Sequence, residues 1–295
     1  MSKYIPAYPT PVGVSVRIVN YKALDGLVLE ALLFESKSSK SSETGLVFCH
    51  GVRGSSLDPV LTGAGQLLAK RGYTVLSINK RNSSALYEQS IFEDTAKDIG
   101  GAIANIHSKG LENVILIAHS LGCTEALYYV ANSKDASVQA IVLLGPPSDI
   151  KGRNTLSFFK RFENPATAYQ EFLSRTNDAI AAGRPDDLFD LLIDLPRVKY
   201  HLATSAKTFA SYRSPQSNCS AIAWIGKIKI PILIVGHRND WVEDDEYEEL
   251  MRAANPINKP DFKVIANADH SFDDHYEELA QLIHIWLEEK RSKRS

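Results

Sequence analysis

The chain begins with two short segments whose hydrophobic pattern predicts paired strands. Residues 14–19 alternate apolar and polar side chains, and residues 27–34 follow the turn signal Asp25-Gly26. Alternation with a period of two is typical of a strand that buries one face. The Ser-rich residues 36–44 come next and indicate a surface loop. The sequence therefore predicts an antiparallel pair of strands at the start of the fold.

Strand-like and helix-like segments then alternate along the chain. The strand-like runs are apolar at consecutive positions, which is typical of parallel strands buried on both faces. The helical segments between them supply the crossovers that parallel strands need. We expect an α/β fold with a doubly wound, mostly parallel sheet. The expected strands are residues 46–49, 74–78, 114–118, 140–144, 232–235 and 262–265, and the expected helices are residues 57–70, 92–108, 121–130, 243–254 and 276–291.

Residues 148–219 interrupt this alternation and contain no segment that indicates a buried strand. Residues 167–182, 186–195 and 199–212 have amphipathic spacing, and Pro185 stands at the expected start of the second helix. We expect a helical cap, inserted into an α/β core made of residues 1–147 and 220–295. Its apolar side chains would pack on the core and partly line a pocket: Phe158, Phe159, Phe162, Tyr169, Phe172, Leu188, Phe189 and Leu192.

Composition narrows the class of protein. The 295 residues are 44% hydrophobic with a net charge of -2, which gives no strong field for binding nucleic acid. The sequence has neither a run of about 18 apolar residues nor the pattern of a signal peptide, so we expect a cytoplasmic protein without a membrane span. Cys49, Cys123 and Cys219 include no C-x-x-C pair, so we expect neither a disulfide framework nor a zinc site. We expect Cys49 and Cys123 to pack in the core.

The pentapeptide Ala118-His119-Ser120-Leu121-Gly122 lies between an expected buried strand and an expected helix. Small residues at both ends allow the tight, strained turn of a nucleophile elbow, whose usual pattern is G-x-S-x-G. Ser120 would stand at a helix N-terminus, where backbone N–H groups and the helix dipole favour developing negative charge. Serine is also a common helix N-cap, so the pentapeptide alone leaves both interpretations open.

The segment His50-Gly51-Val52-Arg53-Gly54 directly follows an expected strand. Acyl transfer needs two backbone donors for the oxyanion, and we expect one from Leu121 and the other from Val52, with Arg53 as the next candidate. A plain glycine turn would have the same sequence. Residues that could also contact a substrate are His50, Gly51, Arg53 and His119. A substrate carboxylate could be bound by Arg53, Lys80 or Arg81, although we expect these three residues to be surface charges.

Two later loops contain a carboxylate and a histidine that could complete the set. Asp240 follows the strand at residues 232–235, and His270 lies in the loop after the last expected strand. We expect His270 to be the general base and Asp240 to hold its tautomer. The competitors are His275, expected at the surface, and Asp244 and Asp245, expected to be ordinary first-turn acids of a helix.

The order Ser120, Asp240, His270, with each residue after a strand, resembles that of the α/β-hydrolase superfamily. The resemblance covers nearly the whole chain except the insertion. Ala118 departs from the usual first glycine, and Cys123 stands where a second glycine often follows. The chain is similar to small esterases and lactonases, which implies cleavage of a small-molecule carboxylic ester or lactone through an acyl-enzyme, without metal or cofactor.

The same residues are compatible with other functions. An acyltransferase would use the same triad with an acceptor alcohol in place of water. The scaffold also supports carbon–carbon bond hydrolysis or a lyase reaction, and it can serve as a non-catalytic ligand receptor. The motifs decide neither the acyl size nor the oligomeric state.

Overall fold

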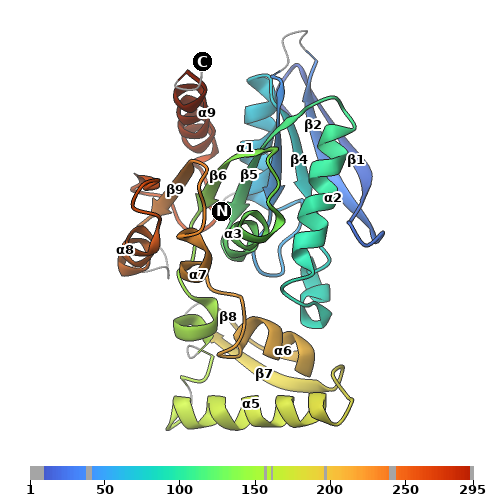
Figure 1. Cartoon of the computed structure of the whole chain (residues 1–295), viewed down its shortest axis with the longest axis vertical. Helices are drawn as coiled ribbons and strands as arrows, with labels where there is room; N and C mark the ends of the chain where they lie inside the picture. Colours follow the sequence, from blue (N-terminus) through green and yellow to red (C-terminus); the bar gives the residue numbers. More distant parts are fainter. Residues whose placement is uncertain are drawn as a thin grey trace, which may run out of the picture.

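The computed structural model describes residues 10–37, 42–155, 158–160, 162–195, 198–238 and 244–292. Its central sheet contains β1 (Val14–Lys22), β2 (Val28–Ser36), β3 (Thr44–Cys49), β4 (Thr74–Ile78), β5 (Asn113–His119), β6 (Val138–Leu144), β9 (Ile232–His237) and β10 (Asp261–Ile265). They lie in the order β1-β2-β4-β3-β5-β6-β9-β10 (Figure 1). β2 pairs antiparallel with β1 and with β4, whereas β4 and the five strands beyond it run parallel. The predicted strand pair and mostly parallel sheet are confirmed.

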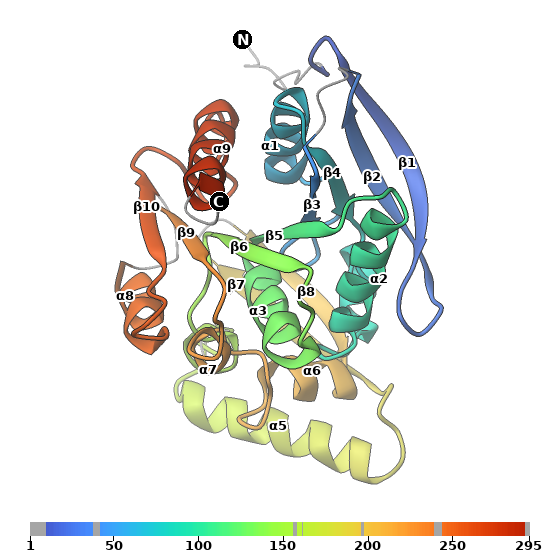
Figure 2. The ribbon, with the colours of Figure 1, turned by 45° about the horizontal axis from the view of Figure 1, so that its top comes forward.

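Alternate residues of the parallel strands enter two separate cores, which explains why these strands are apolar at consecutive positions. In β3, Val47 and Cys49 join one core, whereas Leu46 and Phe48 join the other. Complete burial of one such side chain contributes about 1.5–3 kcal/mol. The first core is covered by α2 (Thr95–His107), α3 (Leu121–Ser133), α7 (Ile222–Ile225) and α8 (Asp244–Ala253), and the second by α1 (Pro59–Lys70) and α9 (Tyr276–Ser292) (Figure 2).

The chain between β6 and α7 leaves the sheet and lies beyond its carboxyl edge (Figure 1). This segment is the one expected to be a cap, and it is called the cap below. Its elements are the π-helix η2 (Ile150–Asn154), α5 (Pro165–Ala181), the strands β7 (Leu188–Leu195) and β8 (Val198–Ser205), and α6 (Ala206–Arg213). β7 and β8 pair antiparallel, from Leu188 opposite Ser205 to Leu195 opposite Val198. The prediction of helices at residues 186–195 and 199–212 is therefore wrong for the first segment and for the first half of the second, whereas residues 206–212 are helical as predicted. A short apolar run fits a helix or a strand equally well, and here pairing with a neighbouring strand decides.

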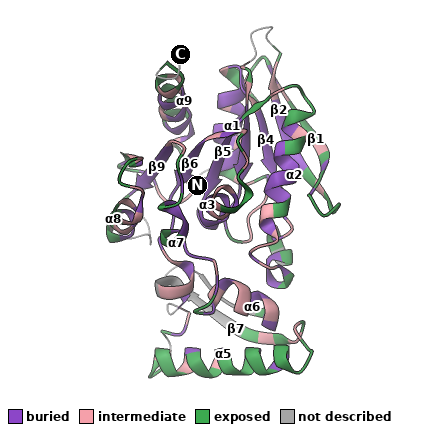
Figure 3. Cartoon of the chain, viewed as in Figure 1, coloured by how far each residue is buried: buried purple, intermediate pink, exposed green. Residues whose placement is uncertain are grey.

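Burial separates the sheet from the outer part of the cap. Figure 3 shows the parallel strands buried, whereas α5 is mostly exposed along its length. The short 3-10 helix η1 (Ser84–Gln89) lies between the sheet and the cap, after β4. Among the helices that the structure describes, none combines the length and apolar character needed to cross a bilayer.

Candidate active site

Ser120 occupies a strained turn between β5 and α3. Its backbone angles are φ 54° and ψ -126°, a region that a residue with a side chain rarely adopts and that costs about 1–3 kcal/mol. The turn is held by hydrogen bonds on both sides. The Ser120 N–H donates to the Leu144 carbonyl at 2.9 Å, and the Ser120 carbonyl accepts from the Cys123 N–H at 2.9 Å. This geometry matches the expected nucleophile elbow and differs from the extended backbone of an ordinary serine N-cap.

Two glycines let the loop after β3 approach the elbow. A methyl group on Gly122 would lie 2.5 Å from the His50 carbonyl oxygen, and one on Gly51 would lie 2.9 Å from the Ser120 Cβ. Both distances are shorter than real Cβ contacts, so both positions favour glycine. The Gly54 N–H donates to the Gly51 carbonyl at 3.2 Å, which closes a tight turn around Val52. The structure thus places the expected oxyanion loop directly against the serine.

His270 lies beside the elbow through its contact with His119. The His119 Nε2–H donates to the His270 carbonyl at 2.8 Å, and the two rings are 4.7 Å apart between centroids. Residues 266–275 join β10 to α9, as the sequence predicts for this loop. His119 therefore fixes the backbone of the expected base while being the chain neighbour of the expected nucleophile.

A second histidine, His237 at the end of β9, lies beside the Nδ1 atom of His270. The distance from His270 Nδ1 to His237 Nε2 is 3.3 Å, and the Tyr247 hydroxyl lies 3.4 Å from the same His237 nitrogen. His237 is only 1% exposed. Gly145 makes this contact possible, because a methyl group there would lie 2.7 Å from His237 Nε2. The sequence did not single out His237, although it stands in the segment chosen for its carboxylate. That carboxylate, Asp240, lies outside the described residues.

The side chains proposed as substrate contacts are engaged within the protein. His50 is fully buried, with Nδ1 2.8 Å from the Gly51 carbonyl oxygen and Nε2 accepting the Lys80 N–H at 3.2 Å. Because Nε2 accepts, the ring is neutral and carries its proton on Nδ1. Burial, and then the charge of Lys80, hold the pKa of His50 well below its ordinary value. Arg53 binds the Glu88 carboxylate through Nε at 3.0 Å and Nη2 at 2.6 Å.

Lys80 and Arg81 differ from the expected surface charges. The Lys80 side chain is fully buried and paired with Glu125 of α3, which is also fully buried. Arg81 binds the buried carboxylate of Asp98 in α2. It also pairs, at 2.9 Å, with the partly exposed carboxylate of Asp25. Lysine is rarely buried unless it is paired, and a partner 45 residues away gives no local sequence signal.

The buried cysteines Cys49 and Cys123 fit roles outside the chemistry. Cys123 is buried, as predicted, and its thiol donates to the Ala118 carbonyl at 3.1 Å. Burial raises the pKa of Cys49 to about 12 and that of Cys123 well above its ordinary value, so both thiols stay protonated near neutral pH. Within the described part of the chain, no group of three or more histidine, cysteine or carboxylate side chains is placed to hold a metal ion.

The cap contains an aromatic cavity of about 670 Å³ between α5 and the start of β7. Three of the apolar cap residues expected to pack on the core or line a pocket, Phe162, Tyr169 and Phe172, stack around Phe159 with ring centroids within 6.2 Å. Phe189 stacks on Phe172 at 5.7 Å. Arg175, Asp187 and Asp190 also line this cavity. These aromatic side chains therefore pack on one another, in a cluster separate from the two cores of the sheet, and not mainly on the α/β core as expected. The frame that carries them contains strands as well as helices.

Comparisons with known proteins agree on the fold. A search of curated proteins found no match. The structure is similar to the α/β hydrolase GrgF from Penicillium sp. sh18, with 15% identity, 93% of this chain and 97% of that chain covered, and a TM-score of 0.67. It is also similar to Est1E from Butyrivibrio proteoclasticus with bound ferulic acid, with 14% identity, coverage of 92% and 99%, and a TM-score of 0.65.

An esterase domain of a Rhodothermus marinus protein has 17% identity, coverage of 92% and 97%, and a TM-score of 0.61. Identities this low establish a shared fold and leave the chemistry to the residues of each site. The sequence itself gives a stronger result, since a family model described as the alpha/beta hydrolase fold matches residues 45–272. Because that match spans most of its length, the chain belongs to the α/β hydrolase fold family.

Proposed function

We propose that the protein is a serine hydrolase that cleaves a small-molecule carboxylic ester or lactone through an acyl-enzyme. The observation that carries the proposal is the backbone of Ser120, held at φ 54° and ψ -126° between β5 and α3. A strained conformation costs stability and persists where the surrounding hydrogen bonds enforce it. In this turn the strain places a hydroxyl at the carboxyl edge of the sheet and at the start of a helix, which is the arrangement an acyl-transfer nucleophile requires.

His270 is the proposed general base. It takes the proton of the Ser120 hydroxyl as that oxygen attacks the substrate carbonyl, and it returns the proton to the leaving alcohol or ring oxygen. A water molecule, deprotonated by the same imidazole, then attacks the acyl carbon and releases the acid. Asp240 is the proposed acid that holds the His270 tautomer and stabilises the imidazolium. The contact between His119 and the His270 carbonyl supports this arrangement, because it keeps residue 270 beside the elbow.

The backbone N–H groups of Leu121 and Val52 are the proposed oxyanion donors. Leu121 is the first residue of α3, where the N–H has no acceptor within the helix and the dipole favours negative charge. The Val52 N–H belongs to the glycine loop that packs against Ser120. Removal of one such donor in a serine hydrolase costs about 10²–10³ in kcat, so the geometry of this loop affects the rate directly.

The experiment compares wild type and Ser120→Ala with p-nitrophenyl butyrate as substrate. We expect wild type to turn over the ester and Ser120→Ala to lose turnover while keeping the same circular dichroism spectrum and unfolding midpoint. Equal rates for both proteins would remove Ser120 from the reaction.

A further inference from the structure

A chain of buried polar side chains begins at the oxyanion loop, and the proposed mechanism does not use it. The Lys80 Nζ group donates to the His50 carbonyl at 3.1 Å and pairs with the Glu125 carboxylate. The two charged side chains are fully buried. Glu125 lies on α3, just over one turn after Ser120, so the ion pair joins the oxyanion loop to the helix of the elbow.

The series of hydrogen-bonded polar side chains continues from Glu125 to the cap. Asn82 Nδ2 donates to Glu125 Oε1 at 2.7 Å and to the Tyr212 hydroxyl oxygen at 3.1 Å. A carboxylate can only accept, which fixes the orientation of the Asn82 amide. The Ser90 hydroxyl donates to the Tyr87 carbonyl at 2.8 Å, so the Tyr212 hydroxyl is the donor in its 3.2 Å contact with Ser90 Oγ. Each step therefore has one defined donor and one defined acceptor.

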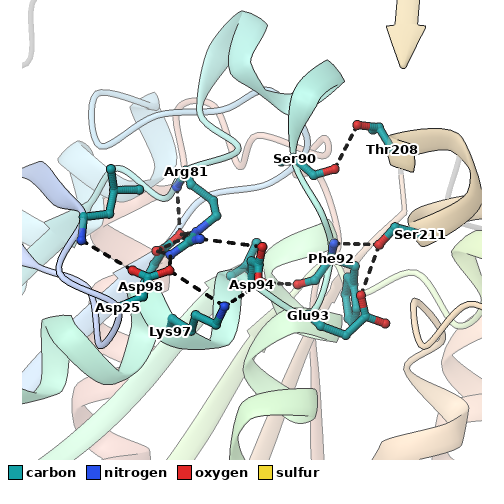
Figure 4. A network of polar contacts seen from close by, with 12 residues as sticks. Asp25, Arg81, Ser90, Phe92, Glu93, Asp94, Lys97, Asp98, Thr208 and Ser211 are labelled. Carbon is teal, nitrogen blue, oxygen red and sulfur yellow. Dashed lines mark hydrogen bonds and ion pairs between the residues drawn. The ribbon is translucent and has the colours of Figure 1, made fainter. Parts of the chain in front are cut away.

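Tyr212 belongs to α6, a cap helix. Figure 4 shows the hydrogen bonds that join this helix to the chain after β4. The Thr208 hydroxyl donates to the Ser90 carbonyl at 2.8 Å. The Ser211 hydroxyl oxygen accepts the Phe92 N–H at 2.8 Å and donates to the Glu93 carboxylate at 3.1 Å. These bonds fix α6 against residues 90–93, and they bring the Tyr212 hydroxyl to the end of the polar chain.

At the other end, His50 connects the chain to the proposed oxyanion donor. Its Nδ1–H donates to the Gly51 carbonyl at 2.8 Å, while its Nε2 is held by the Lys80 N–H. The peptide between Gly51 and Val52 is planar and trans, so its N–H points opposite to its carbonyl. The His50 ring thereby sets the direction of the Val52 N–H, and Lys80 holds His50 through both the ring and the carbonyl.

Stability alone does not account for the buried ion pair. Replacement of a buried pair by apolar side chains of similar volume is often neutral or stabilising, because the charges no longer need to be desolvated. The pair does, however, supply a donor to the His50 carbonyl that an apolar pair would lack. Its distinctive contribution is therefore the orientation of the oxyanion loop.

We propose that Lys80, Glu125, Asn82 and Tyr212 are positioning residues that hold the His50–Val52 loop in the geometry needed for the oxyanion. Through the Tyr212 hydroxyl, the seating of cap helix α6 sets the strength of transition-state stabilisation. This inference rests on the proposed acyl-transfer function. None of the four side chains needs to touch the substrate.

The test uses two tyrosines that pack on each other. The Tyr87 and Tyr212 rings are 4.8 Å apart, and the Tyr87 hydroxyl has no hydrogen-bond partner among the residues that the structure describes. We expect Tyr212→Phe to lower kcat for p-nitrophenyl butyrate by about tenfold with KM changed by less than about twofold, since donor geometry acts on the transition state. Tyr87→Phe, the matched control, should leave both constants unchanged.

A second variant, Lys80→Met/Glu125→Met, separates positioning from folding. We expect it to keep an unfolding midpoint close to that of wild type and to lose about a hundredfold in kcat. Ser120→Ala is measured beside these variants. If Ser120→Ala is inactive while Tyr212→Phe and the folded double variant match wild type, the positioning role is wrong and the hydrolase proposal stands. If Ser120→Ala retains wild-type turnover, both proposals fail. If the double variant does not fold, the two tyrosine variants decide alone.

Discussion

The Nδ1 atom of His270 lies 3.3 Å from the Nε2 atom of His237, with the two rings nearly perpendicular at 86°. In a serine hydrolase the Nδ1 side of the base is where the imidazolium is oriented and stabilised. His237 occupies this side from the end of β9, buried against Tyr247 and Phe272. The proposed base therefore has a second ring beside it, in addition to the proposed carboxylate.

We expect His237→Ala to lower kcat about 10- to 100-fold, because the His270 ring can rotate into the space that the missing ring leaves. His275→Ala is the control, because His275 lies at the outer end of this loop and pairs with Glu278. A kcat for His237→Ala equal to that of wild type would show that the contact has no part in catalysis.

Asp240 and Asp244 can be distinguished by two matched substitutions. We expect Asp240→Asn to lower kcat about 10³-fold or more, because an amide favours the wrong tautomer of the base. Asp244→Asn should have little effect, since Asp244 is the first residue of α8 and we expect it to be an ordinary first-turn acid. Steady-state kinetics on both variants measures this, and a large loss for Asp244→Asn alone would reassign the acid.

The glycines at residues 122 and 65 predict opposite results for the same substitution. Gly122→Ala would force a methyl group to 2.5 Å from the His50 carbonyl oxygen and should destabilise the protein by about 3 kcal/mol. Gly65 lies in α1, and an added methyl group there meets only ordinary contacts at 3.5 Å and beyond. Gly65→Ala should therefore be neutral or stabilise by up to about 1 kcal/mol. Urea unfolding of both variants provides the test, and equal free energies of unfolding would refute the close approach at the elbow.

The buried His50 predicts how stability depends on pH. Burial holds its folded-state pKa well below the unfolded value near 6.5, so the unfolded chain binds more protons below that pH. The stabilising contribution is complete above pH 6.5 and declines as the pH falls. Between pH 6.5 and 5.5 we expect a loss of about 1 kcal/mol from this group. His50→Gln should remove this part of the pH dependence in urea unfolding, and an unchanged slope would show that His50 does not stay neutral in the fold.

The core of the fold could be predicted because its signal is local. Strands such as residues 114–118 are apolar at every position, and only burial on both faces requires this. The cap could not be predicted in the same way. In β7 the leucines at positions 188, 192 and 195 have helical spacing, yet the backbone pairs with β8. That pairing depends on residues that follow along the chain, and periodicity within one segment does not report it.

In the candidate site too, residues with a signal in the neighbouring sequence could be predicted, whereas residues defined by contacts distant in sequence could not. Ser120 could be predicted because the strained turn demands small neighbours within the same pentapeptide. Lys80 was expected at the surface, because its partners Glu125 and His50 come from other elements. The role of His237 could not be predicted for a similar reason, since its contact with His270 exists only after β9 and β10 pair.

The most direct test of the account is to label the protein with a fluorophosphonate and map the adduct by mass spectrometry. A fluorophosphonate reacts with a serine only when a base activates the hydroxyl and donors stabilise the oxyanion. We predict one adduct per chain, on Ser120, and none in Ser120→Ala. Labelling at another serine, or no labelling of the wild-type protein, would contradict the assignment of Ser120 as an activated nucleophile.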